Sequence, residues 1–337
     1  MFQADDSYAG SETCNRLMRV MKEVFGTEFF LPAHQGRACE NILAETFVKP
    51  GDVVPMNYHF TTTKSHITRR GGSVVEVLGK KGFEPQSDEP FKGNFDLELL
   101  ENTIKEVGPE HVPFVRIEAG TNLIGGQPLS MENMLQVAAI CKKYGVMSVL
   151  DASLLQDNLY FIKTREEACK NKSIKEILRT ICDAMDLIYF SSRKLGFSRG
   201  GAIVSNHENL IIKMKEFIPL YEGFLTYGGM NGRDMAALAV GLDENTELDN
   251  IETRIRQVQY LAARLDEFGI PYQRPVGGHA IFVDADKVLD QIPKEEFPAQ
   301  TLAIELYLEA GIRGCEIGYI LADRDPVTRE NRFGGLD

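Results

Sequence analysis

The sequence lacks the features that would place the protein in a membrane or on nucleic acid. No apolar segment approaches the roughly 20 residues of a membrane-spanning helix, and the N-terminus has neither a basic stretch nor an apolar one of the secretory type. Basic residues are outnumbered: 37 lysines and arginines stand against 49 aspartates and glutamates, a net charge of −12. This balance disfavours nucleic acid and anionic membranes as partners. We expect a cytoplasmic protein.

Cysteine and histidine are sparse, six of each, and neither is spaced like a metal site. The absence of a C-x-x-C pair argues against both a zinc site and a disulfide framework. The histidines are dispersed, and His34 and His279 are interpreted as structural residues. Internal repeats and low-complexity tracts are also absent. The chain has 337 residues, of which 43% are hydrophobic. This length and composition suit one large domain and one smaller one.

Two short apolar runs are the most informative segments. Val146-Met-Ser-Val-Leu-Asp151 ends in a carboxylate, and Asp186-Leu-Ile-Tyr-Phe-Ser-Ser-Arg-Lys194 ends in a lysine. Such runs are typical of buried parallel strands, whose carboxyl ends border the ligand crevice. Asp151 and Lys194 are therefore expected to face one crevice. Pyridoxal phosphate needs such a pair, an amine for its Schiff base and a carboxylate that keeps its pyridine nitrogen protonated. A capping aspartate and a solvated lysine are the alternative on spacing alone.

A third segment, Leu31-Pro-Ala-His-Gln-Gly-Arg-Ala-Cys-Glu-Asn-Ile-Leu43, predicts a loop that opens a helix. Gly36 allows backbone N–H groups to approach an anion, the helix N-terminus favours negative charge, and Arg37 adds donors matched to phosphate oxygens. Ser191 or Ser192 could donate a further hydroxyl. The three segments together predict a pyridoxal-phosphate enzyme.

Helical and strand patterns alternate along the chain, as in a doubly wound α/β domain. Besides the two runs above, strands are expected at 52–57, 73–78, 112–118 and 201–205. Helices are expected at 18–25, 38–48, 95–107, 131–144, 173–185 and 206–219, with Asn94 and Ser130 as caps of the third and fourth.

A pair of helical patterns at about 230–268, broken near 244–249, marks the predicted domain boundary. Residues 1–246 would form the large cofactor-binding α/β domain and residues 247–337 a small α+β domain. In the latter, strands are expected at 271–273 and 277–284, and a helix at 301–310 that ends at Gly311. The small domain is expected to be incomplete, because no closing helix or strand precedes Asp337.

Several motifs together resemble one family, the β-eliminating lyases that comprise tryptophanase and tyrosine phenol-lyase. They are Tyr8-Ala-Gly-Ser11, His34-Gln-Gly-Arg37, Phe60-Thr-Thr-Thr63, Phe91-Lys-Gly-Asn-Phe-Asp96, Gly125-Gly-Gln-Pro128, Tyr160-Phe-Ile-Lys163, Tyr227-Gly-Gly229 and Gly277-Gly-His-Ala280. The resemblance spans essentially the whole chain. It implies the aspartate-aminotransferase fold (fold type I, three-layer α/β/α), a homotetramer, pyridoxal phosphate and a monovalent cation such as K⁺.

The resemblance also implies roles for individual residues. It makes Lys194 the Schiff-base lysine and Asp151 the partner of the pyridine nitrogen, as expected above. Tyr8 would be the general acid toward the leaving group. The other implied cofactor contacts are Gln35, Gly36, Arg37 and Ser191 at the phosphate, Phe60 against the ring, and Asn122 near its phenolic oxygen.

Substrate choice is expected to depend on Ile317, where tyrosine phenol-lyases have an arginine that binds the phenol hydroxyl. An apolar residue suits indole, and 91–96 and Asp323-Arg-Asp-Pro326 also look more like tryptophanase. Tryptophan is therefore the first predicted substrate, with tyrosine, cysteine or serine as alternatives.

Other positions depart from the family pattern. Leu154 replaces an arginine near the cofactor, Leu195 replaces an aspartate, and Arg199 replaces an asparagine linked to the cation site. The chain is expected to be shortened at both ends and to lack the arginine that binds the substrate carboxylate. An inactive relative that serves as a binding or assembly subunit is thus the main alternative, and an aminotransferase is a third.

Overall fold

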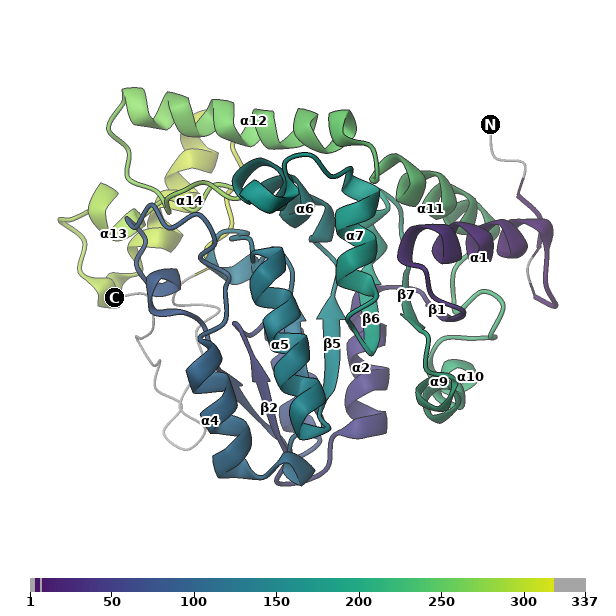
Figure 1. Ribbon diagram of the computed structural model, residues 1–337. Coiled ribbons are helices and arrows are strands. Elements are labelled where there is room, and N and C mark those ends of the chain that lie inside the picture. The colour runs from purple at the N-terminus through teal and green to yellow at the C-terminus, as the bar shows by residue number, and fades with distance from the viewer. Residues whose placement is uncertain (1–3, 7, 318–337) are drawn as a thin grey trace.

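The structure is a computed structural model that describes residues 4–6 and 8–317 (Figure 1). Its centre is a seven-stranded mixed sheet with the strand order β1-β7-β6-β5-β4-β2-β3. β1 and β6 both pair with β7 in antiparallel fashion, and the remaining neighbours are parallel. The strands are β1 (Phe29–Ala33), β2 (Val53–Met56), β3 (Ser73–Glu76), β4 (Phe114–Glu118), β5 (Met147–Asp151), β6 (Leu187–Ser191) and β7 (Gly201–Ser205).

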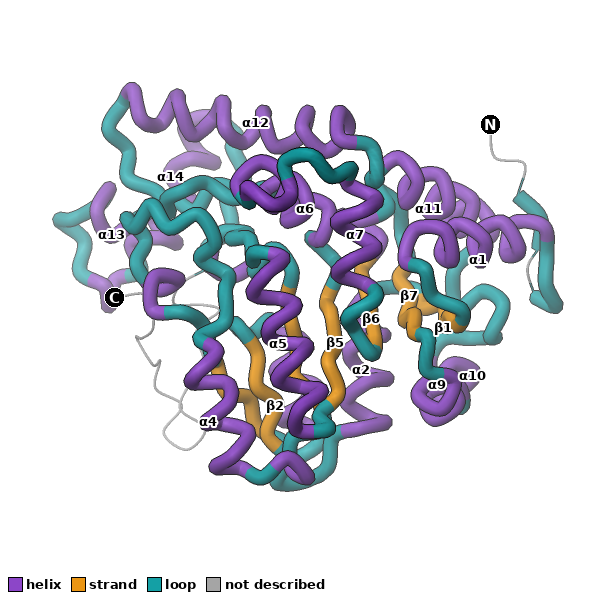
Figure 2. The backbone as a smooth tube through the Cα atoms, in the orientation of Figure 1, coloured by secondary structure: helices purple, strands orange, loops and turns teal. Residues whose placement is uncertain are grey.

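Helices cover both faces of the sheet, which gives the predicted three layers (Figures 1 and 2). Alternate strand residues enter two separate cores: Ile188 and Phe190 of β6 face one, Leu187 and Tyr189 the other. The first core is closed by α1 (Glu12–Phe25), α4 (Leu97–Val107), α5 (Met131–Tyr144), α6 (Leu155–Arg165), α7 (Ile174–Cys182), α11 (Gly232–Glu244) and α12 (Leu248–Glu267). The second is closed by α2 (Gly36–Phe47), α3 (Thr61–Arg69), α9 (Glu208–Lys215) and α10 (Phe217–Tyr221).

The strands and helices expected within residues 1–246 are formed, most with small shifts of their ends, although α1 begins at Glu12 rather than at residue 18. Helices α3 and α6 are not among those that the sequence patterns predict. The predicted cap Ser130 accepts the Asn133 N–H at the start of α5. The predicted cap Asn94 is wrong: its side chain accepts the Ser130 N–H, and Asp96 caps α4 instead. Strand β1 was not expected, because the segment before Gly36 was interpreted as a loop. The helix expected at 206–219 is divided into α9 and α10.

The region after α12 contains α13 (Ala285–Val288) and α14 (Pro298–Ala310), and α14 ends at Gly311 in the left-handed conformation as predicted. The strands expected at 271–273 and 277–284 are not formed, and one isolated bridge joins Tyr272 and Val283. Two prolines and two adjacent glycines disfavour a regular ladder here, because proline lacks the N–H donor and glycine weakens strands. The boundary at residue 246 falls between α11 and α12, and the two-domain division stays a prediction.

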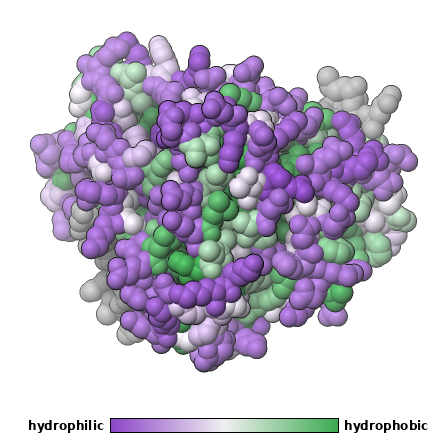
Figure 3. Space-filling model, in the orientation of Figure 1, coloured by the Kyte–Doolittle hydropathy of each residue, from purple (hydrophilic) through white to green (hydrophobic). Residues whose placement is uncertain are grey.

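Hydrophilic residues cover most of the molecular face in Figure 3, with hydrophobic patches between them. Within residues 4–6 and 8–317, none of the helices has the length and apolar character that crossing a membrane would require.

Candidate active site

Asp151 and Lys194 lie at the carboxyl ends of two neighbouring parallel strands. Asp151 is the last residue of β5 and stands in register with Tyr189 of β6. The chain leaves β6 into the single turn α8 (Ser192–Leu195), which carries Lys194. Both side chains line one cavity of about 380 Å³. The crevice predicted from the two apolar runs is therefore present, and it contains an amine and a carboxylate.

The N-terminus of α2 forms one wall of this cavity. The chain turns from β1 into α2 at Gln35 and Gly36, and both line the cavity with Arg37 and Ser191. A methyl group on Gly36 would lie 2.8 Å from the Ser191 Cβ, so only glycine allows the helix end to approach β6 this closely. Free N–H groups at a helix N-terminus favour an anion, and Arg37 adds a guanidinium. These groups suit a phosphate.

Two further predicted residues border the same cavity. Phe60 precedes α3, and Asn122 begins the 3₁₀ turn Asn122–Ile124 that follows β4. Eight of the ten predicted site residues thus line one cavity: Gln35, Gly36, Arg37, Phe60, Asn122, Asp151, Ser191 and Lys194. The donor set fits pyridoxal phosphate, which needs an amine, a carboxylate and an anion cradle. The role of each residue stays a prediction.

The other two predicted residues are not among those that line the cavity. Tyr8 is 63% exposed, and its ring stacks on Phe224 with 5.4 Å between the centroids. Ile317 is half-buried at the end of the described part of the chain. The segment Asp323-Arg-Asp-Pro326 lies outside the described residues. Ser192, the alternative to Ser191, is fully buried, whereas Ser191 reaches the cavity.

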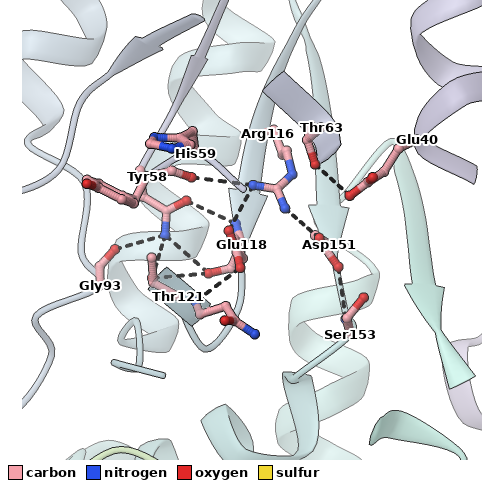
Figure 4. Close-up of polar contacts among 12 residues, drawn as sticks. Glu40, Tyr58, His59, Thr63, Gly93, Arg116, Glu118, Thr121, Asp151 and Ser153 are labelled. Atoms are coloured by element: carbon pink, nitrogen blue, oxygen red, sulfur yellow. Dashed lines mark hydrogen bonds and ion pairs between the residues drawn. The ribbon is translucent and has the colours of Figure 1, made fainter. Parts of the chain in front are cut away.

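Beneath Asp151 lies a buried charge network that the sequence reasoning missed (Figure 4). Arg116 of β4 is 1% exposed and donates through Nη2 to Asp151 Oδ2 at 2.6 Å. Its Nη1 donates to Glu118 Oε2 at 2.9 Å, and its Nε donates to the Tyr189 hydroxyl at 2.8 Å. The Tyr189 hydroxyl in turn donates to Asp151 Oδ2 at 2.9 Å. One guanidinium therefore joins two carboxylates and a phenol.

A third buried carboxyl, Glu40 of α2, also borders the cavity. The hydroxyls of Thr62 and Thr63 each donate to one of its oxygens, both at 2.6 Å. Burial raises the pKa of Glu40 to about 7, although the charge of Arg116 acts in the opposite direction. Glu40 is therefore a group that gains or loses a proton near neutral pH.

The positions that depart from the family pattern are also located. Leu154 is buried and lines the cavity, so an apolar side chain occupies the place of the expected arginine. Arg199 is exposed at the end of the loop that follows α8.

His279 packs against Gly126, and burial together with the charges of Lys194 and Arg254 lowers its pKa to about 4. Among the residues that the structure describes, no group of three or more histidine, cysteine or acidic side chains could hold a metal ion.

Comparison with known proteins supports the family resemblance found in the sequence. The family model described as β-eliminating lyase matches residues 1–337. A "Probable beta-eliminating lyase" of Trichomonas vaginalis is 51% identical, over 100% of this chain and 74% of that protein. The protein named tyrosine phenol-lyase in Pasteurella multocida is 42% identical, over 99% of this chain and 73% of that protein. The protein of the same name in Fusobacterium nucleatum is 43% identical, over 100% of this chain and 74% of that protein.

Solved structures agree with the fold. Bna3p of Saccharomyces cerevisiae superposes with a TM-score of 0.66 at 17% identity, over 92% of this chain and 74% of that one. Serine palmitoyltransferase of Sphingomonas wittichii gives a TM-score of 0.56 at 14% identity, over 82% and 64%. The predicted fold type I architecture of pyridoxal-phosphate enzymes is confirmed. By sequence along its whole length, the chain belongs to the β-eliminating lyase family.

Proposed function

We propose that the protein removes the aromatic group from an aromatic amino acid by pyridoxal-phosphate-dependent β-elimination, with release of pyruvate and ammonia. The observation that carries this proposal is the convergence of Lys194, Asp151 and the N-terminus of α2 on one cavity of a β-eliminating lyase. Lys194 would bind the cofactor aldehyde, and Asp151 would accept a hydrogen bond from the protonated ring nitrogen. The phosphate would be held by Gln35, Gly36, Arg37 and Ser191, and the ring by Phe60 and Asn122.

Each residue then has a distinct task. When bound, the cofactor ring accepts the electron pair left on the α-carbon after its proton is removed. The Lys194 amine, displaced by the substrate amine, takes that α-proton through Nζ. An indole or phenol ring leaves poorly until it is protonated, and the Tyr8 hydroxyl is the proposed donor of that proton. Because Tyr8 does not line the cavity of its own chain, its role requires movement of the N-terminal segment or a second subunit.

Tryptophan is the first candidate substrate. Ile317 is apolar where a phenol-reading arginine is expected, and an apolar contact favours indole. Tyrosine is the second candidate, because the relatives at 42% and 43% identity described above are named tyrosine phenol-lyase. Elimination from cysteine or serine is a further alternative, since an apolar pocket discriminates weakly between leaving groups.

Three other expectations are kept as proposals, the first from the sequence features described above and the other two from the family resemblance. They are a cytoplasmic location, a homotetramer and a monovalent cation such as K⁺. Light scattering of the purified protein measures its mass in solution. Replacing K⁺ by a larger organic cation in the assay tests the cation, for which Arg199 is an unfavourable neighbour.

The experiment that tests the proposed function is a product assay on the purified protein with added cofactor. Tryptophan, tyrosine, cysteine and serine are supplied separately, and indole, phenol and pyruvate are measured, with Lys194→Ala as the control. We expect indole or phenol in equal amount to pyruvate, and none from the control. Cofactor bound by Lys194 without any product would favour the binding or assembly subunit. A keto acid formed from the intact substrate skeleton would favour an aminotransferase.

A further inference from the structure

Arg116 is the largest fully buried side chain described, and it lies on β4 in register with Val149 of β5, whereas Glu118 is in register with Asp151. Its two terminal nitrogens contact different carboxylates, Asp151 and Glu118, at 2.6 and 2.9 Å. Figure 4 shows the guanidinium between the two acids. The guanidinium has five N–H donors, so it can serve two carboxylates at once, and removing one partner of a buried ion pair leaves an uncompensated charge.

The hydrogen bonds of Asp151 leave one acceptor position open. Oδ2 accepts from Arg116 and from the Tyr189 hydroxyl, and Oδ1 accepts the Ser153 N–H at 3.0 Å. Each carboxylate oxygen accepts about two hydrogen bonds. The remaining position is therefore on Oδ1, and it is available to a donor in the cavity.

The charges in the network do not cancel. Arg116 carries one positive charge, whereas Asp151 and Glu118 carry two negative ones. Glu118 accepts the Asn122 N–H through Oε1 at 3.1 Å and Arg116 through Oε2, so both of its oxygens face donors, as suits a carboxylate. Burial raises the pKa of Glu118, and the charge of Arg116 opposes that effect. With Glu118 ionised, one negative charge is left over beside the cavity.

This extra negative charge increases the attraction of the site for a cation near Asp151. If Arg116 faced Asp151 alone, the two would form a neutral pair with little attraction for a proton in the cavity. Because Glu118 neutralises Arg116 from the other side, the charge of Asp151 remains effective. In a buried site of low dielectric constant such a difference is large. Glu118 also accepts the backbone N–H of Asn122, which lines the same cavity.

We propose that Glu118 is a positioning residue that keeps the negative charge of Asp151 available to the ring nitrogen of pyridoxal phosphate, by neutralising Arg116 between them. The inference rests on the proposed function, because it needs the cofactor in this cavity. Glu118 itself lines the cavity, and in this proposal it acts through Arg116 and Asp151. The same carboxylate links the ring-nitrogen end of the site to Asn122.

The test measures the proton on the ring nitrogen directly, by NMR of bound cofactor whose ring carries the heavy nitrogen isotope. In the native protein we expect a protonated nitrogen. Glu118→Gln keeps the side-chain shape but removes the charge, and it should shift the signal toward the unprotonated nitrogen. Glu118→Asp retains the charge and should restore the native signal in part. An unchanged signal in Glu118→Gln would overturn the proposal.

A double variant distinguishes loss of the Glu118 charge from a folding defect caused by the single substitution. Arg116→Met combined with Glu118→Gln leaves Asp151 as the one charge of the trio, and the ring nitrogen should again be protonated. Loss of the proton in this double variant would overturn the proposal.

Binding of the cofactor gives a second readout. The preference for the cofactor over its analogue with carbon in place of the ring nitrogen should fall about tenfold or more in Glu118→Gln, the equivalent of one pKa unit.

If the protein binds the cofactor but forms no product, the proposed function fails, and the ring-nitrogen signals still test the role of Glu118. If the native protein does not bind the cofactor through Lys194, no ring-nitrogen signal is obtained from any variant. That outcome overturns the inference together with its basis. Binding by all variants with identical ring-nitrogen signals overturns the inference alone.

Discussion

Gly36 and Ser191 are in such close contact that a methyl group on Gly36 would lie 2.8 Å from the Ser191 Cβ and 3.1 Å from its backbone nitrogen. The contact joins the N-terminus of α2 to the carboxyl end of β6, two segments separated by more than half of the large domain in sequence. It fixes the distance between the anion-binding helix end and the turn that carries Lys194. The geometry of the proposed phosphate cradle therefore depends on the absence of one side chain.

Gly36→Ala is expected to weaken cofactor binding while leaving the fold intact. The added methyl group must push α2 away from β6, and overpacking of this kind costs about 1–3 kcal/mol, or roughly a tenfold to hundredfold loss of affinity if it falls on the site. Titration with pyridoxal phosphate, followed by absorbance, measures the change. Gly314→Ala is the matched control, because its added Cβ would make only an ordinary contact at 3.5 Å. Equal affinities in both variants would contradict the prediction.

Glu40→Gln should change how stability depends on pH. Glu40 has a pKa of about 7 in the folded protein against a usual value of 4.5. Below pH 4.5 it is protonated in both states. Between the two values only the folded state keeps the proton, so stability falls as pH rises, and above about 7 the loss is complete. The shift corresponds to a cost of about 3 kcal/mol, which the amide removes.

The measurement is urea unfolding of the cofactor-free protein at pH 5 and pH 8. The stability of Glu40→Gln relative to the native protein should rise by up to about 3 kcal/mol between the two. Glu98→Gln, at an exposed position of α4, should show no such trend. Parallel pH profiles for Glu40→Gln and the native protein would show that Glu40 is not held protonated by burial.

Tyr8→Phe tests the proposed general acid. Loss of its hydroxyl should slow elimination of indole or phenol by about a hundredfold or more, the usual contribution of a positioned acid. Elimination of a thiolate from an S-substituted cysteine should change little, because that group leaves without prior protonation. Pyruvate release measures both rates. The control Tyr260→Phe removes an exposed hydroxyl from α12. Equal losses on both substrates would assign Tyr8 a structural role.

Ile317→Arg tests the basis of the substrate proposal. A guanidinium that reaches the phenol hydroxyl should raise the kcat/KM ratio of tyrosine to tryptophan by about tenfold, the value of one hydrogen bond to a charged group. Ile312→Arg adds the same charge at an exposed position of the neighbouring segment and serves as the control. If the ratio rises in neither variant, residue 317 does not select the substrate.

Most strands and helices within residues 1–246 could be predicted from the sequence because their signals are local, although β1, α3 and α6 could not. Asp151 and Lys194 each end an apolar run, and the order of parallel strands then brings them together. The cap of α4 was misassigned because Asn94 and Asp96 are equally good caps by residue type, and only the tertiary contact of Asn94 with Ser130 decides between them. The apolar content after α12 predicts strands that do not form, because two prolines and a glycine pair disfavour a regular ladder there.

The charge network was missed for a different reason. Arg116 and Glu118 stand in the otherwise apolar strand Phe114-Val-Arg-Ile-Glu118, and charges in a central strand are a signal that could have been used. Their partners, Asp151 and Tyr189, belong to other strands, so the pairing depends on sheet order and register. Tyr8 could not be placed by sequence either, because the position of a terminal segment depends on long-range contacts.

The central claim is that Lys194 binds the cofactor, and the most direct measurement is the position of the covalent bond. The native protein is incubated with pyridoxal phosphate, the bond is reduced with borohydride, and the digested peptides are examined by mass spectrometry. We expect one modified peptide, which contains Lys194, and no modification there in Lys194→Ala. Specific modification of a different lysine, or an unmodified protein despite saturating cofactor, would contradict it.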